Sequence, residues 1–186
     1  MAGLGLNVSP GFVLLASFLY FCGGWAAVAA LFTAALAHEL GHLSAIALSG
    51  AEVRRVRFGA SGAVIDLDGQ LTFRQEMAIA AAGPVAGILF AWICFLADTP
   101  YYCYVGLISL LASVFNLLPV YPLDGGRLAF LLMCAVMPEE TAKTILRVIG
   151  TACGLLVTGT GICLHAISAA AIGIWMTVLA NVPGLR

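Results

Sequence analysis

The sequence predicts an all-α integral membrane protein with about six transmembrane helices and a small β-hairpin insertion between spans two and three. Of its 186 residues, 62% are hydrophobic and only 9% are charged, and the mean hydropathy is +1.08. A soluble domain of this length needs more charge to cover its surface. Four long stretches contain no Asp, Glu, Lys or Arg: 1–37, 77–97, 99–123 and 148–185. Since a spanning helix takes roughly 20 apolar residues, the first and last stretches are long enough to turn back once.

The expected spans follow from these stretches and from the glycines and prolines that interrupt them. They lie at about 10–22, at 25–48, at 77–97, from 101 to about 119, and in two helices that share 141–182. Gly23-Gly24 separates the first two spans, and the turn between the last two falls between 159 and 168. The apolar stretch 128–138 is too short to span and is expected to form a short or re-entrant helix.

A β-hairpin is expected within 50–76, the most polar part of the chain. Residues 53–58 and 63–68 alternate roughly between apolar and polar side chains. Gly59-Ala-Ser-Gly62 between them is typical of a turn, so the pattern indicates two short antiparallel strands.

The placement of the charges indicates orientation and excludes one class of partner. Basic residues lie between spans two and three, between spans four and five, and after span six: Arg54, Arg55, Arg57, Arg74, Arg127, Lys143, Arg147 and Arg186. In a six-span chain all of these fall on one side, which the positive-inside rule makes cytoplasmic, so both termini are expected there. The net charge of −1 argues against a nucleic-acid partner. The six cysteines form no CxxC pair and are expected to be small apolar residues of membrane helices.

The strongest local signal is the segment Ala37-His-Glu-Leu-Gly-His42. Histidines four residues apart on a helix lie on one face, so His38 and His42 can reach the same metal ion. Glu39 lies beside them and can take a proton from a water that the metal activates. Ionisable residues within a membrane span are costly, and their presence indicates function. The structural alternative is a polar cluster that packs helices together.

Asp124 is the main candidate for a third ligand, because a catalytic zinc ion takes three protein ligands and keeps one position open. It lies in the segment Asn116-Leu-Leu-Pro-Val-Tyr-Pro-Leu-Asp-Gly-Gly-Arg127. Pro119 and Pro122 end the preceding helix, and Gly125-Gly126 is expected to let the backbone turn tightly beside the ligand. Irregular backbone at membrane depth is tolerated only inside protein or beside a watery cavity. The alternative is an ordinary polar loop at the membrane surface.

Together, His38-Glu-Leu-Gly-His42 and Asn116-x-Leu-Pro-x-x-Pro-Leu-Asp124-Gly-Gly resemble the site-2 protease family of intramembrane zinc metalloproteases (peptidase M50-like). The resemblance covers spans two to four, and the small size is similar to the branch that includes the sporulation-factor-processing protease of spore-forming bacteria. It implies that His38, His42 and Asp124 bind one Zn²⁺ per chain. It also implies that Glu39 activates the water and that Asn116 lies near the site, where its amide could donate a hydrogen bond to an oxyanion. A helix-packing role is the alternative for Asn116.

The sequence departs from this family at one place. In the family, Ala-Gly-Pro of the third core span is commonly followed, after an intervening pair, by Asn. Here Ala82-Gly-Pro84 is followed by Val85, Ala86 and then Gly87. A role carried by that Asn is therefore missing or moved, although Gly83 and Gly87 could still let helices approach closely.

The resemblance also suggests that the hairpin is membrane-associated. A helical substrate must become extended before a protease can reach its carbonyl groups, and an exposed strand edge could hold it by backbone hydrogen bonds. The alternative is a plain basic cytoplasmic loop.

The predicted function is hydrolysis of peptide bonds in membrane-spanning or membrane-tethered proteins, by a single membrane-embedded metalloprotease domain of residues 1–186. The expected surroundings are the bacterial cytoplasmic membrane, with a protein substrate and lipid as partners; association with itself or with a regulatory membrane protein is left open. One alternative is a membrane metal-ion transporter, which would favour polar ligands distributed along several helices. Another is a catalytically inactive relative, against which the intact set of ligands and Glu39 argues.

Overall fold

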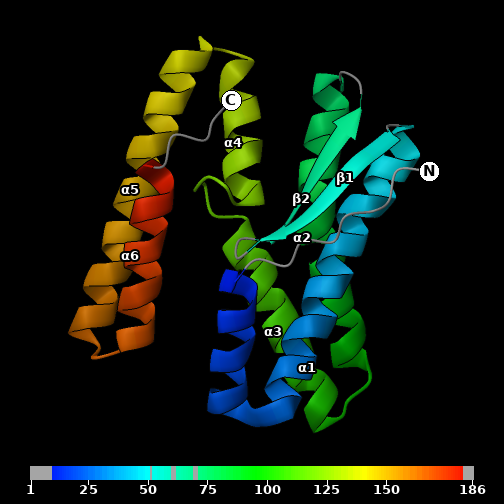
Figure 1. The fold of residues 1–186 in the computed structure, drawn as a ribbon, viewed down its shortest axis with the longest axis vertical. Helices are drawn as coiled ribbons and strands as arrows, with labels where there is room; N and C mark the ends of the chain where they lie inside the picture. Colours follow the sequence, from blue (N-terminus) through cyan, green and yellow to red (C-terminus); the bar gives the residue numbers. More distant parts are fainter. Residues whose placement is uncertain (1–9, 51, 60–61, 69–70, 182–186) are drawn as a thin grey trace. The chain divides into compact units, whose positions relative to one another are not determined.

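The computed structural model describes residues 10–50, 52–59, 62–68 and 71–181, with the side chains of 23–50 and 71–181. The elements follow in the order α1 (Pro10–Ser49), β1 (Glu52–Gly59), β2 (Gly62–Asp68), α2 (Phe73–Leu96), α3 (Pro100–Asn116), α4 (Asp124–Cys134), α5 (Glu139–Cys163) and α6 (Ile167–Asn181) (Figure 1). The chain packs as two compact units, Met1–Phe115 and Asn116–Arg186.

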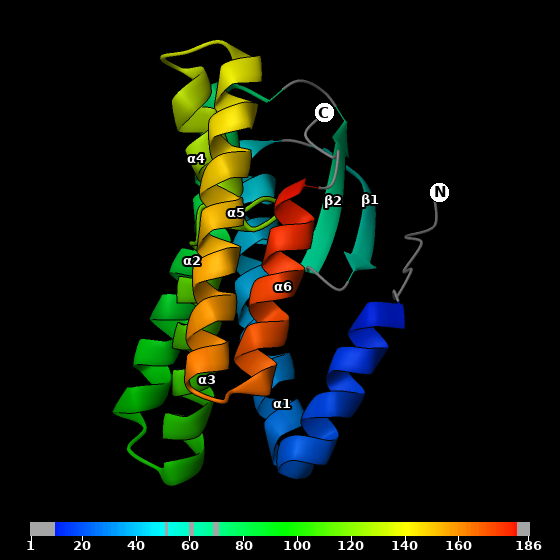
Figure 2. The ribbon, with the colours of Figure 1, turned by 90° about the vertical axis from the view of Figure 1, so that its left-hand side faces the viewer.

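A break at Gly24 divides α1 into two helical segments. The backbone of Gly24 has φ 64° and ψ −163°, a conformation that favours glycine. Figure 2 shows the two segments meeting at an angle. The break coincides with the one expected at Gly23-Gly24, and the second segment, Gly23–Ser49, is an apolar helix of 27 residues.

Small residues let α1, α2 and α3 approach one another closely. A β-carbon built at Gly41 of α1 would lie 2.6 Å from Cβ of Ala86 on α2, so a larger residue could not occupy this position. Ala30, Cys94 and Val105, one from each of the three helices, form a buried apolar cluster. Helices in lipid associate through such close packing, because there is no hydrophobic drive between them.

The strands β1 and β2 form a two-stranded antiparallel sheet, in which Val56 lies opposite Ile65. The register shifts between Val53 and Arg55, as in a β-bulge. The expected strands were 53–58 and 63–68, within one residue of the observed bounds, and residues 60 and 61 of the expected turn lie outside the described residues.

The base of the hairpin is held by Gln75, near the start of α2. Its Nε2 donates a hydrogen bond of 3.0 Å to the carbonyl of Ser49 at the end of α1. Its Oε1 accepts a 2.8 Å hydrogen bond from the backbone N–H of Thr72, the N-cap residue of α2. One side chain therefore joins the end of the helix before the hairpin to the start of the helix after it.

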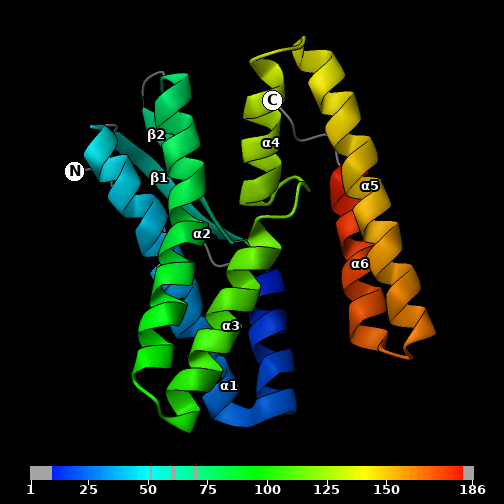
Figure 3. The same ribbon diagram turned by 180° about the vertical axis from the view of Figure 1, so that it is seen from behind.

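In the second unit, α5 and α6 form a helical hairpin whose two helices lie side by side (Figures 1 and 3). Close approach depends on glycines: a β-carbon at Gly154 would lie 2.7 Å from the backbone nitrogen of Thr177. At the end of α6, Nδ2 of Asn181 donates to Oγ1 of Thr151, in the middle of α5, at 3.0 Å. His165, with φ 54°, lies in the connection between the helices, inside the window expected for this turn.

The short helix α4 begins earlier than expected. Sequence reasoning placed it at 128–138 and assigned Gly125-Gly126 to a tight turn, but the helix runs from Asp124 to Cys134 and both glycines lie in its first turn. That prediction was wrong: it relied on the low helix propensity of glycine, which favours a turn over a helix. These positions instead need a residue without a side chain, because the preceding loop lies against them.

The lengths and surfaces of the helices are typical of an integral membrane protein. Among the described residues, three helical segments are long and apolar enough to cross a membrane: Gly23–Ser49, Phe73–Leu96 and Glu139–Cys163. Two shorter apolar helices are Pro100–Asn116 and Ile167–Asn181. Large apolar side chains face outward, with Trp25 74% exposed and Trp92 63% exposed, as expected where lipid replaces water.

Candidate metal centre

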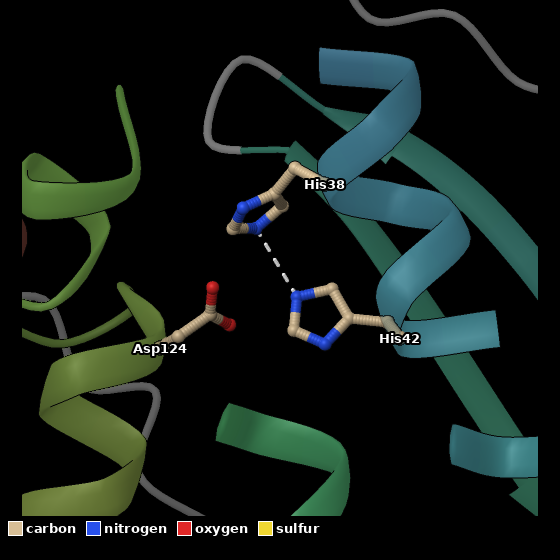
Figure 4. Close-up of side chains that lie close together, drawn as sticks. All are labelled: His38, His42 and Asp124. Carbon is tan, nitrogen blue, oxygen red and sulfur yellow. Dashed lines mark hydrogen bonds between the residues drawn. The ribbon is translucent and has the colours of Figure 1, made fainter. Parts of the chain in front are cut away.

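His38 and His42 lie one turn apart on α1 and point toward each other (Figure 4). Their Nε2 atoms are 3.2 Å apart, and the planes of the two rings are inclined at 80°. Both side chains are buried, each with 9% exposure. The pair therefore presents two imidazole nitrogens to one point inside the protein.

A hydrogen bond to the backbone orients the ring of His42. Nδ1 lies 2.8 Å from the carbonyl oxygen of Ile79 on α2, and since a carbonyl can only accept, Nδ1 carries the proton. Nε2 of the neutral ring then holds a lone pair and is available as a ligand. Metal-binding histidines commonly have their second nitrogen fixed in this way.

The backbone of α2 supplies the space for the same ring. A β-carbon built at Gly83 would overlap Nε2 of His42 and would lie 2.5 Å from Cε1. Gly41, between the two histidines, in turn lies against Ala82 and Ala86 of α2. The Ala82-Gly83 step thus lets α2 pack against α1 directly behind the imidazole, and no larger residue fits there.

Asp124 is the first residue of α4, and the segment before it is tightly packed. Val120 and Leu123 are 0% and 4% exposed, and the Leu123 N–H donates to the carbonyl of Val120 at 2.8 Å. A β-carbon at Gly126 would lie 2.5 Å from the carbonyl carbon of Val120, and one at Gly125 would overlap the carbonyl of Leu117. The two glycines therefore let this segment wrap over the first turn of α4, which fixes the backbone of Asp124.

One potential ligand atom from each of His38, His42 and Asp124 lies within 4.8 Å of the other two (Figure 4). Zinc binds imidazole nitrogen at about 2.0–2.1 Å in a tetrahedral arrangement, which separates two nitrogen ligands by about 3.3 Å. The 3.2 Å between the two Nε2 atoms fits this value. Two imidazoles and a carboxylate also form a donor set that catalytic zinc sites use.

Glu39 and Asn116 lie on the elements that carry or precede the potential ligands. Glu39 follows His38 on α1, and Asn116 is the last residue of α3, at the start of the segment that leads to Asp124. Both side chains are partly buried and both interact with other residues. Their positions in the chain suit the roles expected of them, and those roles remain predictions.

Comparison with known proteins supports the assignment of a zinc site to this chain. Residues 99–157, which include Asp124, match the model of peptidase family M50. Over 150 residues the chain is 29% identical to the stage IV sporulation protein FB of Bacillus subtilis, an alignment that covers 76% of this chain and 52% of that protein. Over 107 residues it is 26% identical to a zinc metalloprotease of Methanocaldococcus jannaschii, covering 53% of this chain and 31% of that one.

The chain is similar to the site-2 protease family, in sequence over part of its length and in fold.

Its fold agrees with that of a solved site-2 protease. The site-2 protease from Methanocaldococcus jannaschii superposes with a TM-score of 0.77 over 97% of this chain and 91% of that one, at 20% sequence identity. This chain spans about half the length of the sporulation protein and about a third of the archaeal zinc metalloprotease.

The structure also shows what occupies the position where this chain lacks the expected Asn. A side chain at Gly87 would overlap Oγ of Ser113 on α3. Oγ of Ser109 donates to the carbonyl of Gly87 at 2.9 Å, and both serines are 1% exposed. The space that a residue at 87 would fill is therefore taken by serine hydroxyls of the neighbouring helix.

Sequence reasoning missed two contributors to the site. The carbonyl of Ile79 orients His42, and no side-chain pattern could reveal a backbone acceptor. Gly83 was noted only as a point of close helix approach, whereas its lack of a side chain makes room for the His42 ring. The sequence alone does not mark a glycine that must lack a side chain to leave room for a ring on another helix. The requirement becomes visible only when the two helices are packed together.

Proposed function

We propose that this chain is an intramembrane zinc metalloprotease that hydrolyses peptide bonds in membrane-spanning or membrane-tethered proteins. The observation that carries the proposal is the convergence of two buried imidazoles and a carboxylate; Glu39 is the residue that follows His38 on α1. Burying ionisable side chains in an apolar membrane protein costs free energy, so their presence there indicates a function.

His38, His42 and Asp124 are the proposed ligands of one zinc ion per chain. A bound zinc ion would lower the pKa of a water ligand toward 7 and polarise the carbonyl of the scissile bond. His42 binds through Nε2, because Nδ1 donates to Ile79.

Glu39 is the proposed general base and acid. Its carboxylate accepts a proton from the attacking water and returns it to the leaving nitrogen, a role typically worth 10²–10⁴-fold in rate. Asn116 is the proposed oxyanion donor: an amide N–H aimed at the developing charge stabilises it more in the transition state than in the ground state. Both assignments rest on chain position and family resemblance.

The hairpin β1–β2 is the proposed clamp for an extended substrate. Each strand of a two-stranded sheet has one edge that is not paired within the sheet, and such an edge can accept another strand by backbone hydrogen bonds. The anchoring of its base by Gln75 fixes the hairpin to the helix that carries the histidines. An unwound segment held there would present its carbonyl groups in an accessible form.

The proposed topology has six spans, counting the two segments of α1, α2, α3, α5 and α6, with both termini in the cytoplasm of a bacterial cell. The positive-inside rule supports it, because the basic residues gather toward one side of such a topology: in β1 and at the start of α2, in α4 and the first part of α5, and after α6. In this scheme residues 1–186 act as one metalloprotease domain, and the catalytic group lies nearer the cytoplasmic face.

Glu39→Gln tests this function most simply. The amide keeps the size of the side chain but accepts no proton at neutral pH, so cleavage of a co-expressed single-pass reporter should fall at least 100-fold while zinc content is unchanged. Glu76→Gln, the same substitution in the first turn of α2, is the matched control and should cleave normally. Equal processing by wild type and Glu39→Gln would refute proteolysis by this site.

A further inference from the structure

Gly150 on α5 lies where three segments of the second unit meet. A β-carbon built there would be 2.9 Å from Cβ of Ala180 on α6. It would also be 3.6 Å from Cγ1 and 3.8 Å from Cα of Val120, in the segment that precedes Asp124. The α5 helix therefore passes close to this segment at Gly150, where any added side chain would come into van der Waals contact with Val120.

Backbone hydrogen bonds connect Val120 to the start of α4. The carbonyl of Val120 accepts from the N–H of Leu123 at 2.8 Å, and the carbonyl of Leu123 accepts from the N–H of Arg127 at 3.0 Å. Asp124 lies between these two bonds. The side chain of Val120 is completely buried and closely packed. A group that displaces it therefore also displaces the backbone that leads to Asp124.

We propose that Gly150 is a positioning residue for the metal site. Because it has no side chain, Val120 can pack against α5, and this packing fixes the backbone that carries Asp124. The two C-terminal helices, which supply no proposed ligand, thereby set the affinity for zinc. This inference rests on the proposed role of Asp124 as a ligand and adds a contact that determines how well it performs that role.

The α5 helix offers a matched control for the test. A β-carbon at Gly159, nine residues along the same helix, would meet no described atom within 4 Å. Substituting either glycine by Val changes the local helix propensity in the same way. Gly150→Val places its side chain against both Ala180 and Val120, whereas Gly159→Val meets neither. A difference between the two variants therefore excludes helix propensity as the cause, and a second substitution at Val120 separates that contact from the one with Ala180.

The experiment measures zinc affinity of the purified full chain in detergent by competition with a chromogenic chelator. Gly150→Val should lower the affinity about 10- to 100-fold, as changes around metal ligands commonly do, and Gly159→Val should stay within about twofold of wild type. Adding Val120→Ala to Gly150→Val removes the opposing methyl groups and should restore part of the loss, which a general loss of stability would not do.

The outcomes separate this inference from the function beneath it. If wild type binds zinc and Gly150→Val binds it equally well, Gly150 does not position the ligand, and the proposed metal site stands. If wild type binds no zinc, the proposed function fails and this inference with it. Should Gly150→Val not fold, Val120→Ala alone leaves a gap beneath the segment and should also weaken zinc binding; unchanged affinity there would overturn the proposal.

Discussion

The imidazole of His42 is fixed from two sides by α2, at the backbone of Ile79 and at the bare α-carbon of Gly83. The first contact decides which nitrogen can bind a metal, and the second decides where the ring can lie. Neither neighbour offers a ligand atom, yet both act on the ligand. At this scale the metal site is a property of helix packing as much as of the HExxH spacing.

Gly83→Ala should therefore lower the affinity for zinc by about tenfold or more, because the added methyl group must displace the His42 ring from its position. Zinc retained by the purified variant after graded chelation is the measurement. Gly159→Ala, which places the same methyl group in open space, should retain zinc like wild type. Wild-type retention by Gly83→Ala would mean that the ring is free to move and that this contact does not matter.

Single residues were predictable where their chemistry is local. The four-residue spacing of His38 and His42 places both rings on one helix face whatever the rest of the chain does. Asp124 was identifiable because so few carboxylates occur in an apolar sequence. The contact of Gly150 with Val120 was not, because it joins residues thirty positions apart and involves no polar atom.

The hairpin β1–β2 is the one β element in the described part of the chain, and it lies between two helices that Gln75 ties together at its base. A sheet of two strands is marginal by itself in water. Its attachment to α1 and α2 fixes the base of the hairpin. In the proposed clamp, an outer edge of the two-stranded sheet pairs with an extended segment of the substrate.

Ile65→Pro should abolish cleavage while leaving zinc binding intact. Proline removes a backbone donor and fixes φ, so it disrupts the ladder where Ile65 lies opposite Val56. Ile65→Thr keeps a β-branched residue with high strand propensity and should cleave at a rate close to that of wild type. Cleavage and zinc content measured on the same preparations give the answer; normal cleavage by Ile65→Pro would end the clamp hypothesis.

Elements bounded by backbone constraints were predicted well, and those bounded by packing were not. The positive φ of Gly24 divides α1 at the glycine pair that the sequence marks. The start of α4 was misplaced because Gly125-Gly126 indicates a turn by propensity, whereas here the pair is helical and makes room for the loop beside it. Close approach and conformational freedom are two uses of glycine that a sequence does not distinguish.

At the scale of the whole molecule, the proposed function requires that ligands distant in sequence bind one ion. His38 and His42 belong to an apolar helix near the start of the chain, whereas Asp124 follows a proline-containing segment more than 80 residues later. Composition alone predicted a membrane protein, because 62% hydrophobic residues and 9% charged ones cannot form a soluble surface. Whether this carboxylate reaches the histidines depends on tertiary structure; the sequence marked Asp124 by its place in an apolar, proline-containing segment, and the family resemblance pointed to the same residue.

X-ray absorption at the zinc edge of the purified full chain tests this claim most directly. The account predicts one zinc per chain with two imidazole nitrogens at about 2.0–2.1 Å, oxygen completing the coordination, and no sulfur ligand. After graded treatment with a chelator, Asp124→Ala should retain much less zinc than wild type, because only His38 and His42 remain as protein ligands. A spectrum showing thiolate sulfur at about 2.3 Å, or wild-type protein without stoichiometric zinc, would contradict the account.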